Sequence, residues 1–293
     1  MNFIRNRNFR AGPQTSLEGF ICPQNSDKQQ KVKVFGRSGG VILLSTAFIG
    51  FKFYSKVKTK MDSEKKLVAC LYEAYNIGKK ERIDSAEHHV LFLGNSITHH
   101  APASTIPGAD PFWEGDWGMC ASRKDSDYVR RIEARLHLLN PKTTVEENNI
   151  AEYERDFSID LDSLIGGLCK GKDLIVLKIG ENVKDEDGYY AAFKHLTEYC
   201  LRFTDNVMVV GAYWKAPKKE EAMVRVAREK NLKYVPLFWI YELYEEEVKA
   251  HVGDTIYNIN GNPYPIKTDF IITHPNDKGM KMIADEIYKN IEL

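Results

Sequence analysis

The stretch Val90-Leu91-Phe92-Leu93-Gly94-Asn95-Ser96-Ile97-Thr98 decides the fold of this chain. Its apolar run ends abruptly at Gly-Asn-Ser, a pattern typical of a buried strand that leads into a tight turn. Ser96 therefore follows the carboxyl end of a strand, which is where open α/β sheets bind their ligands. A serine at such a place either caps the next helix or, with a base within reach, acts as a nucleophile.

Further segments downstream have the character of strands, and helical segments separate them. The strands are expected at about 144–149, 173–179, 207–213 and 234–238, and the helices at about 128–139, 161–169, 189–203, 218–230 and after Asp277. This alternation predicts a five-stranded parallel sheet with helices on both faces. Right-handed crossovers leave few topologies, of which a flavodoxin-like α/β/α three-layer sandwich is the best match. Residues 87–293 are assigned to this domain.

Charge and cysteine content exclude several classes of function. The 293 residues carry 41 Lys and Arg against 41 Asp and Glu, so the overall charge gives no case for nucleic-acid binding. The cysteines form no C-x-x-C pair and no Cys/His cluster, so we expect no metal site. Their odd number also argues against a complete disulfide framework.

The amino-terminal part differs from the rest in composition. Residues 1–38 are polar and basic and are expected to be disordered. Residues 39–54 are almost wholly apolar, and we interpret them as an uncleaved membrane anchor, although a buried helix packed on the domain is the alternative. Residues 55–86 are charged and predict a helical spacer. We therefore expect a membrane-anchored protein with an extracytoplasmic catalytic domain. The lysines that follow the apolar segment make its second flank basic as well, so the flanking charges do not distinguish the two orientations in the membrane.

A loop rich in Pro, Gly and Trp follows the Ser96 turn and extends from His99 to Ala121. Long loops above a sheet often build binding sites. Trp113 and Trp117 could stack on a sugar ring, because an aromatic face suits an apolar C–H surface. Equally, they could close a small satellite core.

Three polar residues are expected in loops at the same edge of the sheet, namely Ser96, Asn182 and His274. This set suits acyl transfer, in which serine attacks a carbonyl while histidine takes its proton and returns it to the leaving alcohol. The oxyanion that develops needs donors such as a backbone N–H and an asparagine amide.

Together these segments resemble the SGNH, or GDSL-like, hydrolase superfamily over about residues 90–293. Gly94–Thr98 resembles the block that carries the nucleophile, Gly180–Asn182 resembles the block whose asparagine donates to the oxyanion, and His274–Gly279 resembles the block with the catalytic histidine. The resemblance implies a flavodoxin-like fold and esterase or deacylase activity without metal or cofactor. Residues 117–122 and 149–154 resemble a bacterial branch associated with polysaccharides.

The chain departs from the family pattern at two positions. The block that usually supplies a glycine N–H to the oxyanion hole has no glycine at Asn149–Ala151, so Ala151 is the stand-in beside the donors Ser96 and Asn182. The family usually has an aspartate three residues before the histidine, where this chain has Ile271. Asp269 lies two residues farther back and could orient the imidazole, but a backbone carbonyl could do so instead.

These observations predict a serine esterase that removes small acyl groups, foremost acetyl, from a carbohydrate. The acyl-enzyme would form on Ser96 with His274 as base and Asp269 as the candidate third member, and Trp113 and Trp117 would hold the sugar. Two alternatives stay open. One is a catalytically silent, membrane-tethered glycan-binding module, and the other is an acyltransferase that uses the same residues.

Overall fold

The computed structural model describes residues 86–105 and 112–293. The predicted tail, anchor and most of the spacer, residues 1–85, lie outside the described residues and stay predictions. Within the described residues, no helix is long and apolar enough to cross a membrane.

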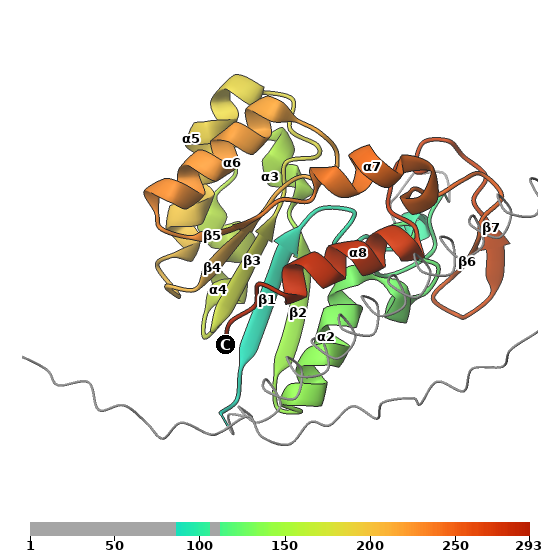
Figure 1. Ribbon diagram of the computed structural model, residues 1–293, viewed down its shortest axis with the longest axis horizontal. Coiled ribbons are helices and arrows are strands. Elements are labelled where there is room, and N and C mark those ends of the chain that lie inside the picture. Colours follow the sequence, from blue (N-terminus) through green and yellow to red (C-terminus); the bar gives the residue numbers. More distant parts are fainter. Residues whose placement is uncertain (1–85, 106–111) are drawn as a thin grey trace, which may run out of the picture. The chain divides into compact units, whose positions relative to one another are not determined.

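Five parallel strands form the central sheet, in the order β2-β1-β3-β4-β5 (Figure 1). Their bounds are β1 His89–Gly94, β2 Thr144–Asn149, β3 Leu174–Lys178, β4 Val207–Val210 and β5 Lys233–Val235. The strand order and the parallel pairing confirm the predicted flavodoxin-like sheet. The prediction for the last strand was too long, because Phe238 already begins a helix.

Helices cover both faces of the sheet, so the molecule has the three predicted layers (Figure 1). One face packs against α2 Tyr128–Leu139, α7 Phe238–Val248 and α8 Asp277–Tyr288. The other face packs against α3 Ala151–Arg155, the π-helix Asp162–Gly166, α4 Gly167–Cys169, α5 Glu186–Cys200 and α6 Pro217–Glu229. Alternate strand residues separate between the two cores, as the period of a strand requires: Val90 and Phe92 face one, and Leu91 and Leu93 the other.

The helix predicted at 128–139 is confirmed at both ends. Asp127 begins it by accepting a hydrogen bond from the Arg130 N–H, and Asn140 ends it. In contrast, α3, α7 and the short antiparallel pair β6 Thr255–Tyr257 and β7 Pro263–Pro265 were not predicted.

The register of the sheet aligns three loops. Gly94 at the end of β1 is paired with Asn149 on one side and with Lys178 on the other. Ser96, Ala151 and Gly180 therefore each lie two residues beyond the same row of the ladder. This register places the predicted nucleophile and the predicted oxyanion donors together at the carboxyl ends of the strands.

Candidate active site

The turn that carries Ser96 is short and tightly packed. The carbonyl of Asn95 accepts hydrogen bonds from the N–H groups of Thr98 and His99, at 2.8 and 3.0 Å. A Cβ atom at position 94 would lie 1.8 Å from the Thr98 hydroxyl, so only glycine allows the chain to turn here. The turn leaves Ser96 half-buried at the edge of the sheet.

Ser96 and His274 are in direct contact. The Ser96 Oγ lies 2.8 Å from Nε2 of His274, and Nδ1 of the same ring lies 3.0 Å from the carbonyl oxygen of Ile271. Because a carbonyl only accepts hydrogen bonds, the ring proton belongs on Nδ1. This tautomer leaves the Nε2 lone pair directed at the serine, which is the arrangement a general base needs.

Burial keeps the imidazole neutral. It lowers the pKa of His274 to about 4, against the effects of the hydrogen bond to Ile271 and of the Glu181 carboxylate, which raise it. The indole of Trp214 packs edge-on to the ring, with a centroid distance of 5.8 Å, and its N–H donates to the carbonyl of Thr273. Trp214 was not expected at the site from the sequence.

The loop that carries His274 is anchored on both sides. Asn276 caps α8 by accepting from the N–H groups of Lys278 and Gly279, while its amide donates to the carbonyls of Glu247 and Lys249. These contacts attach the loop to the end of α7 and fix the histidine relative to the sheet.

Asp269 does not contact the histidine. Its side chain is exposed, and the carbonyl of Ile271 occupies the Nδ1 position that a third acidic member would take. The expectation that Asp269 orients the imidazole is therefore corrected in favour of the backbone alternative.

The predicted oxyanion donors lie beside this pair. Nδ2 of Asn182 donates to the Glu154 carboxylate at 2.6 Å, which leaves its second N–H for another acceptor. The N–H of Ala151 donates to Oδ1 of Asn149 at 2.9 Å, so an oxyanion would have to share or displace this contact. Ser96, Ala151 and Asn182 all line one cavity together with His274.

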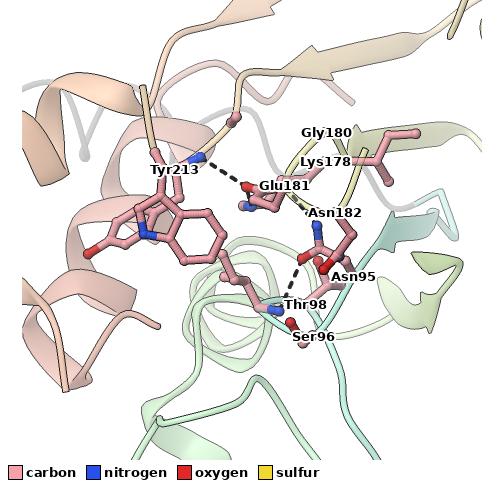
Figure 2. A network of polar contacts seen from close by, with 12 residues as sticks. Asn95, Ser96, Thr98, Lys178, Gly180, Glu181, Asn182 and Tyr213 are labelled. Carbon is pink, nitrogen blue, oxygen red and sulfur yellow. Dashed lines mark hydrogen bonds and ion pairs between the residues drawn. The ribbon is translucent and has the colours of Figure 1, made fainter. Parts of the chain in front are cut away.

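A buried polar network lies next to Ser96 (Figure 2). The Asn95 amide donates to Glu181 at 2.6 Å and its oxygen accepts from the N–H of Ile97 at 3.2 Å. Glu181 also accepts from Lys178 at 2.6 Å and from the N–H of Tyr213 at 2.9 Å. Although burial opposes ionisation, Lys178 and these donors hold the pKa of Glu181 below its usual range. The network thus joins the Ser96 turn to the loops that follow β3 and β4.

The cavity has a volume of about 460 Å³. An aromatic wall, which we define as His100, Phe112 and Phe270, borders it, and Phe270 is 73% exposed. The ring centroids of Phe112 and Phe270 are 5.7 Å apart, and those of His100 and Phe112 are 5.9 Å apart. The polar lining comprises Asn149, Glu152 and Arg155.

Trp113 and Trp117 do not line this cavity, which corrects the expectation that they hold the substrate. They are 0% and 5% exposed and pack edge-to-face at a centroid distance of 5.7 Å. Their indole N–H groups donate to the carbonyls of His100 and Ala121. The two tryptophans are therefore buried, as the alternative interpretation expected, but they belong to the main core on the α2/α8 face of the sheet and not to a small satellite core.

The part of the chain that the structure describes contains no group of three or more His, Cys, Asp or Glu side chains that could hold a metal ion. Three of its cysteines, Cys120, Cys169 and Cys200, are buried free thiols.

No protein-family model and no curated protein matches this chain. Solved structures are similar to it. An acetyl xylan esterase, AlAXEase, is 13% identical with a TM-score of 0.45, over 70% of this chain and 100% of its own. Axe2, an acetylxylan esterase from Geobacillus stearothermophilus, is 16% identical with a TM-score of 0.46, over 72% and 97%. A two-domain esterase, CEX, active on acetylated mannans, is 14% identical with a TM-score of 0.47, over 74% and 53%. At these levels of similarity, the function has to be inferred from the chain's own residues.

Proposed function

We propose that this protein is a serine esterase that removes small acyl groups from a carbohydrate. The observation that carries the proposal is the 2.8 Å contact between Ser96 Oγ and His274 Nε2, in a ring whose other nitrogen is held by a backbone carbonyl. A nucleophile in contact with an oriented base is the minimal equipment for acyl transfer.

The reaction proceeds through an acyl-enzyme. Ser96 Oγ attacks the ester carbonyl while its proton passes to Nε2 of His274. The oxyanion that forms is stabilised by the free N–H of Asn182 and by the backbone N–H groups of Ser96 and Ala151. Collapse of this intermediate breaks the ester bond, and His274 returns the proton to the leaving sugar hydroxyl. Water then attacks the acyl-enzyme with His274 again as base, which releases the acid and restores Ser96.

The imidazolium that forms at each step is buried, and no carboxylate of residues 86–105 or 112–293 contacts it. The Ile271 carbonyl accepts a hydrogen bond from Nδ1–H and so stabilises the charged ring, and the Glu181 carboxylate favours the charge from a longer distance. A serine–histidine dyad with a backbone partner therefore replaces a triad.

The lining of the cavity supports a carbohydrate substrate. The aromatic wall of His100, Phe112 and Phe270 offers apolar faces that suit the C–H surface of a sugar ring. Asn149, Glu152 and Arg155 provide polar groups for hydroxyls around it. Acetylated xylan and mannan oligosaccharides are the first substrates to test, in agreement with the polysaccharide-associated branch that the sequence resembles.

The test is hydrolysis of p-nitrophenyl acetate and of acetylated oligosaccharides by the whole 293-residue chain. We expect Ser96→Ala and His274→Ala each to lower kcat by at least about 10³-fold, because either change removes the reacting pair. Asp269→Asn is the matched control and should leave kcat unchanged. Intact mass measurement should detect an acetyl adduct on the wild type that Ser96→Ala lacks.

Two results would contradict the proposal. If Ser96→Ala retained wild-type turnover, the nucleophile would be assigned wrongly. If the folded wild type hydrolysed no ester of any acyl length, the protein would not be an esterase. Loss of activity in Asp269→Asn would instead restore an acid to the catalytic set.

A further inference from the structure

Glu154 is a buried carboxylate directly behind the oxyanion site. It lies in α3, three residues after Ala151, and is 1% exposed. No role for it follows from the hydrolytic steps described above, since it does not line the cavity.

The contacts of Glu154 are all with N–H donors. Its Oε2 accepts from Nδ2 of Asn182 at 2.6 Å. Its Oε1 accepts from the backbone N–H of Asn182 and from the Asn95 amide, both at 3.3 Å, and from the N–H of Gly180. Within the described residues, no lysine or arginine forms an ion pair with it, whereas the neighbouring Glu181 has Lys178.

A carboxylate can only accept hydrogen bonds, and this property decides which way the Asn182 amide points. The amide nitrogen must face Glu154, because the amide oxygen in that place would meet another acceptor. With the amide fixed in this orientation, the second N–H of the same nitrogen is held ready for the oxyanion.

We propose that Glu154 is the positioning residue that sets the side-chain orientation of Asn182 and so assembles the oxyanion hole. This inference rests on the proposed esterase function and deepens it. Glu154 acts through Asn182 and does not touch the substrate.

The burial of the Glu154 carboxylate also favours a functional role for this residue. Burial and the nearby Glu181 charge raise its pKa, whereas the N–H donors of Asn182 and Gly180 oppose this effect and favour the ionised form that the orientation of Asn182 requires. Unfavourable buried charges concentrate at functional sites, where the charge is needed.

Glu154→Gln separates this role from a purely structural one. The glutamine oxygen matches the Oε1 site, which faces three donors, and its NH₂ group then faces Asn182. That NH₂ group needs an acceptor, so the Asn182 amide should reverse. Tyr153→Phe is the matched control, because it removes a buried hydrogen bond of the same helix, from Tyr153 to the Ala192 carbonyl, without a contact to Asn182.

The experiment is a double-mutant cycle on the whole chain with p-nitrophenyl acetate. We expect Asn182→Ala to lower kcat by about 10²–10³-fold. Glu154→Gln should lower kcat by at least about 10-fold, and neither change should alter KM much. In the Asn182→Ala background, Glu154→Gln should have no further effect, because its only route to catalysis is gone. Tyr153→Phe should leave kcat unchanged in both backgrounds.

A second readout does not depend on activity. The side-chain amide signal of Asn182 in a ¹H–¹⁵N spectrum, assigned by its loss in Asn182→Ala, should shift in Glu154→Gln and not in Tyr153→Phe. An unchanged signal, or a loss of kcat that persists fully in the Asn182→Ala background, would overturn the role of Glu154. A shifted signal in a chain without esterase activity would support the positioning role and reject the proposed function.

Discussion

The Nδ1 atom of His274 lies 3.0 Å from the carbonyl oxygen of Ile271, only three residues earlier in the chain. The imidazole that we propose as the base is thus oriented by its own loop. A peptide carbonyl does not ionise in water, so the orientation of the ring does not depend on the titration of a partner acid.

This relationship predicts activity in moderately acidic solution. Because the pKa of His274 is lowered from 6.5 to about 4, the imidazole is neutral and able to act as a base throughout that interval. The acid limb of kcat/KM against pH should therefore have its midpoint near pH 4. Circular dichroism at each pH separates protonation from unfolding. A midpoint at 6.5 in folded protein would show that the ring is solvated.

The buried ion pair beneath the site should be essential for stability. Lys178 and Glu181 are 0% and 1% exposed and lie 2.6 Å apart. Lys178→Met leaves an uncompensated buried carboxylate and should lower the free energy of unfolding by about 3–5 kcal/mol in urea titrations. The double variant Lys178→Met/Glu181→Gln removes that charge. Its free energy of unfolding should therefore be about 1 kcal/mol or more above that of Lys178→Met alone. Simple additivity of the two changes would contradict the buried pairing.

Glu220 in α6 should make stability depend on pH. Burial raises its pKa from 4.5 to about 7, and its Oε2 has no hydrogen-bond partner among the described residues. The folded state therefore binds this proton more tightly than the unfolded state. The resulting stabilisation is fully present below pH 4.5 and is lost as the pH rises through about 7. Urea unfolding over this range should show the decline in the wild type and a smaller one in Glu220→Gln. Parallel curves for the two proteins would assign the pH dependence to other groups.

Phe270 and Trp117 should respond to substitution in opposite ways. Phe270 is 73% exposed on the cavity wall, so Phe270→Ala should change the free energy of unfolding by no more than about 0.5 kcal/mol. It should raise KM for acetylated oligosaccharides and leave KM for p-nitrophenyl acetate unchanged. Trp117 is 5% exposed in the core, and Trp117→Ala should destabilise by about 3–5 kcal/mol. A KM for oligosaccharides that did not respond to Phe270→Ala would remove this residue from the sugar site.

The sheet could be predicted because its strands are short apolar runs that end at turn residues. The run Val90–Leu93 is buried on both faces, and such strands lack polar alternation. The helix α7 escaped prediction for the opposite reason. Only Ile240 and Val248 of its eleven residues are buried, and the backbone is kinked at Tyr244, so no clear helical period is visible.

The proximity of Ser96 and His274 could be predicted because Ser96 follows a strand end and His274 precedes a helix in a recognisable order. The aromatic wall could not be predicted, because the position of an aromatic ring depends on packing that the sequence does not display. Trp113 entered the core, while Phe112, its neighbour in the chain, lines the cavity. The role of Glu154 could not be predicted from the sequence either, because only the folded chain brings α3 into contact with Asn182.

The aromatic wall has a consequence for which changes of the chain can alter the cavity independently of His274. Phe112 and Phe270 come from connecting segments that belong to neither the ladder of paired strands nor the serine turn. The two rings differ in what lies next to them in the chain. Phe112 belongs to the loop after the Ser96 turn, whereas Phe270 immediately precedes Ile271, whose carbonyl holds the His274 ring. An insertion or deletion around Phe270 would therefore alter the cavity wall and the histidine together, while a change around Phe112 would reach the wall alone.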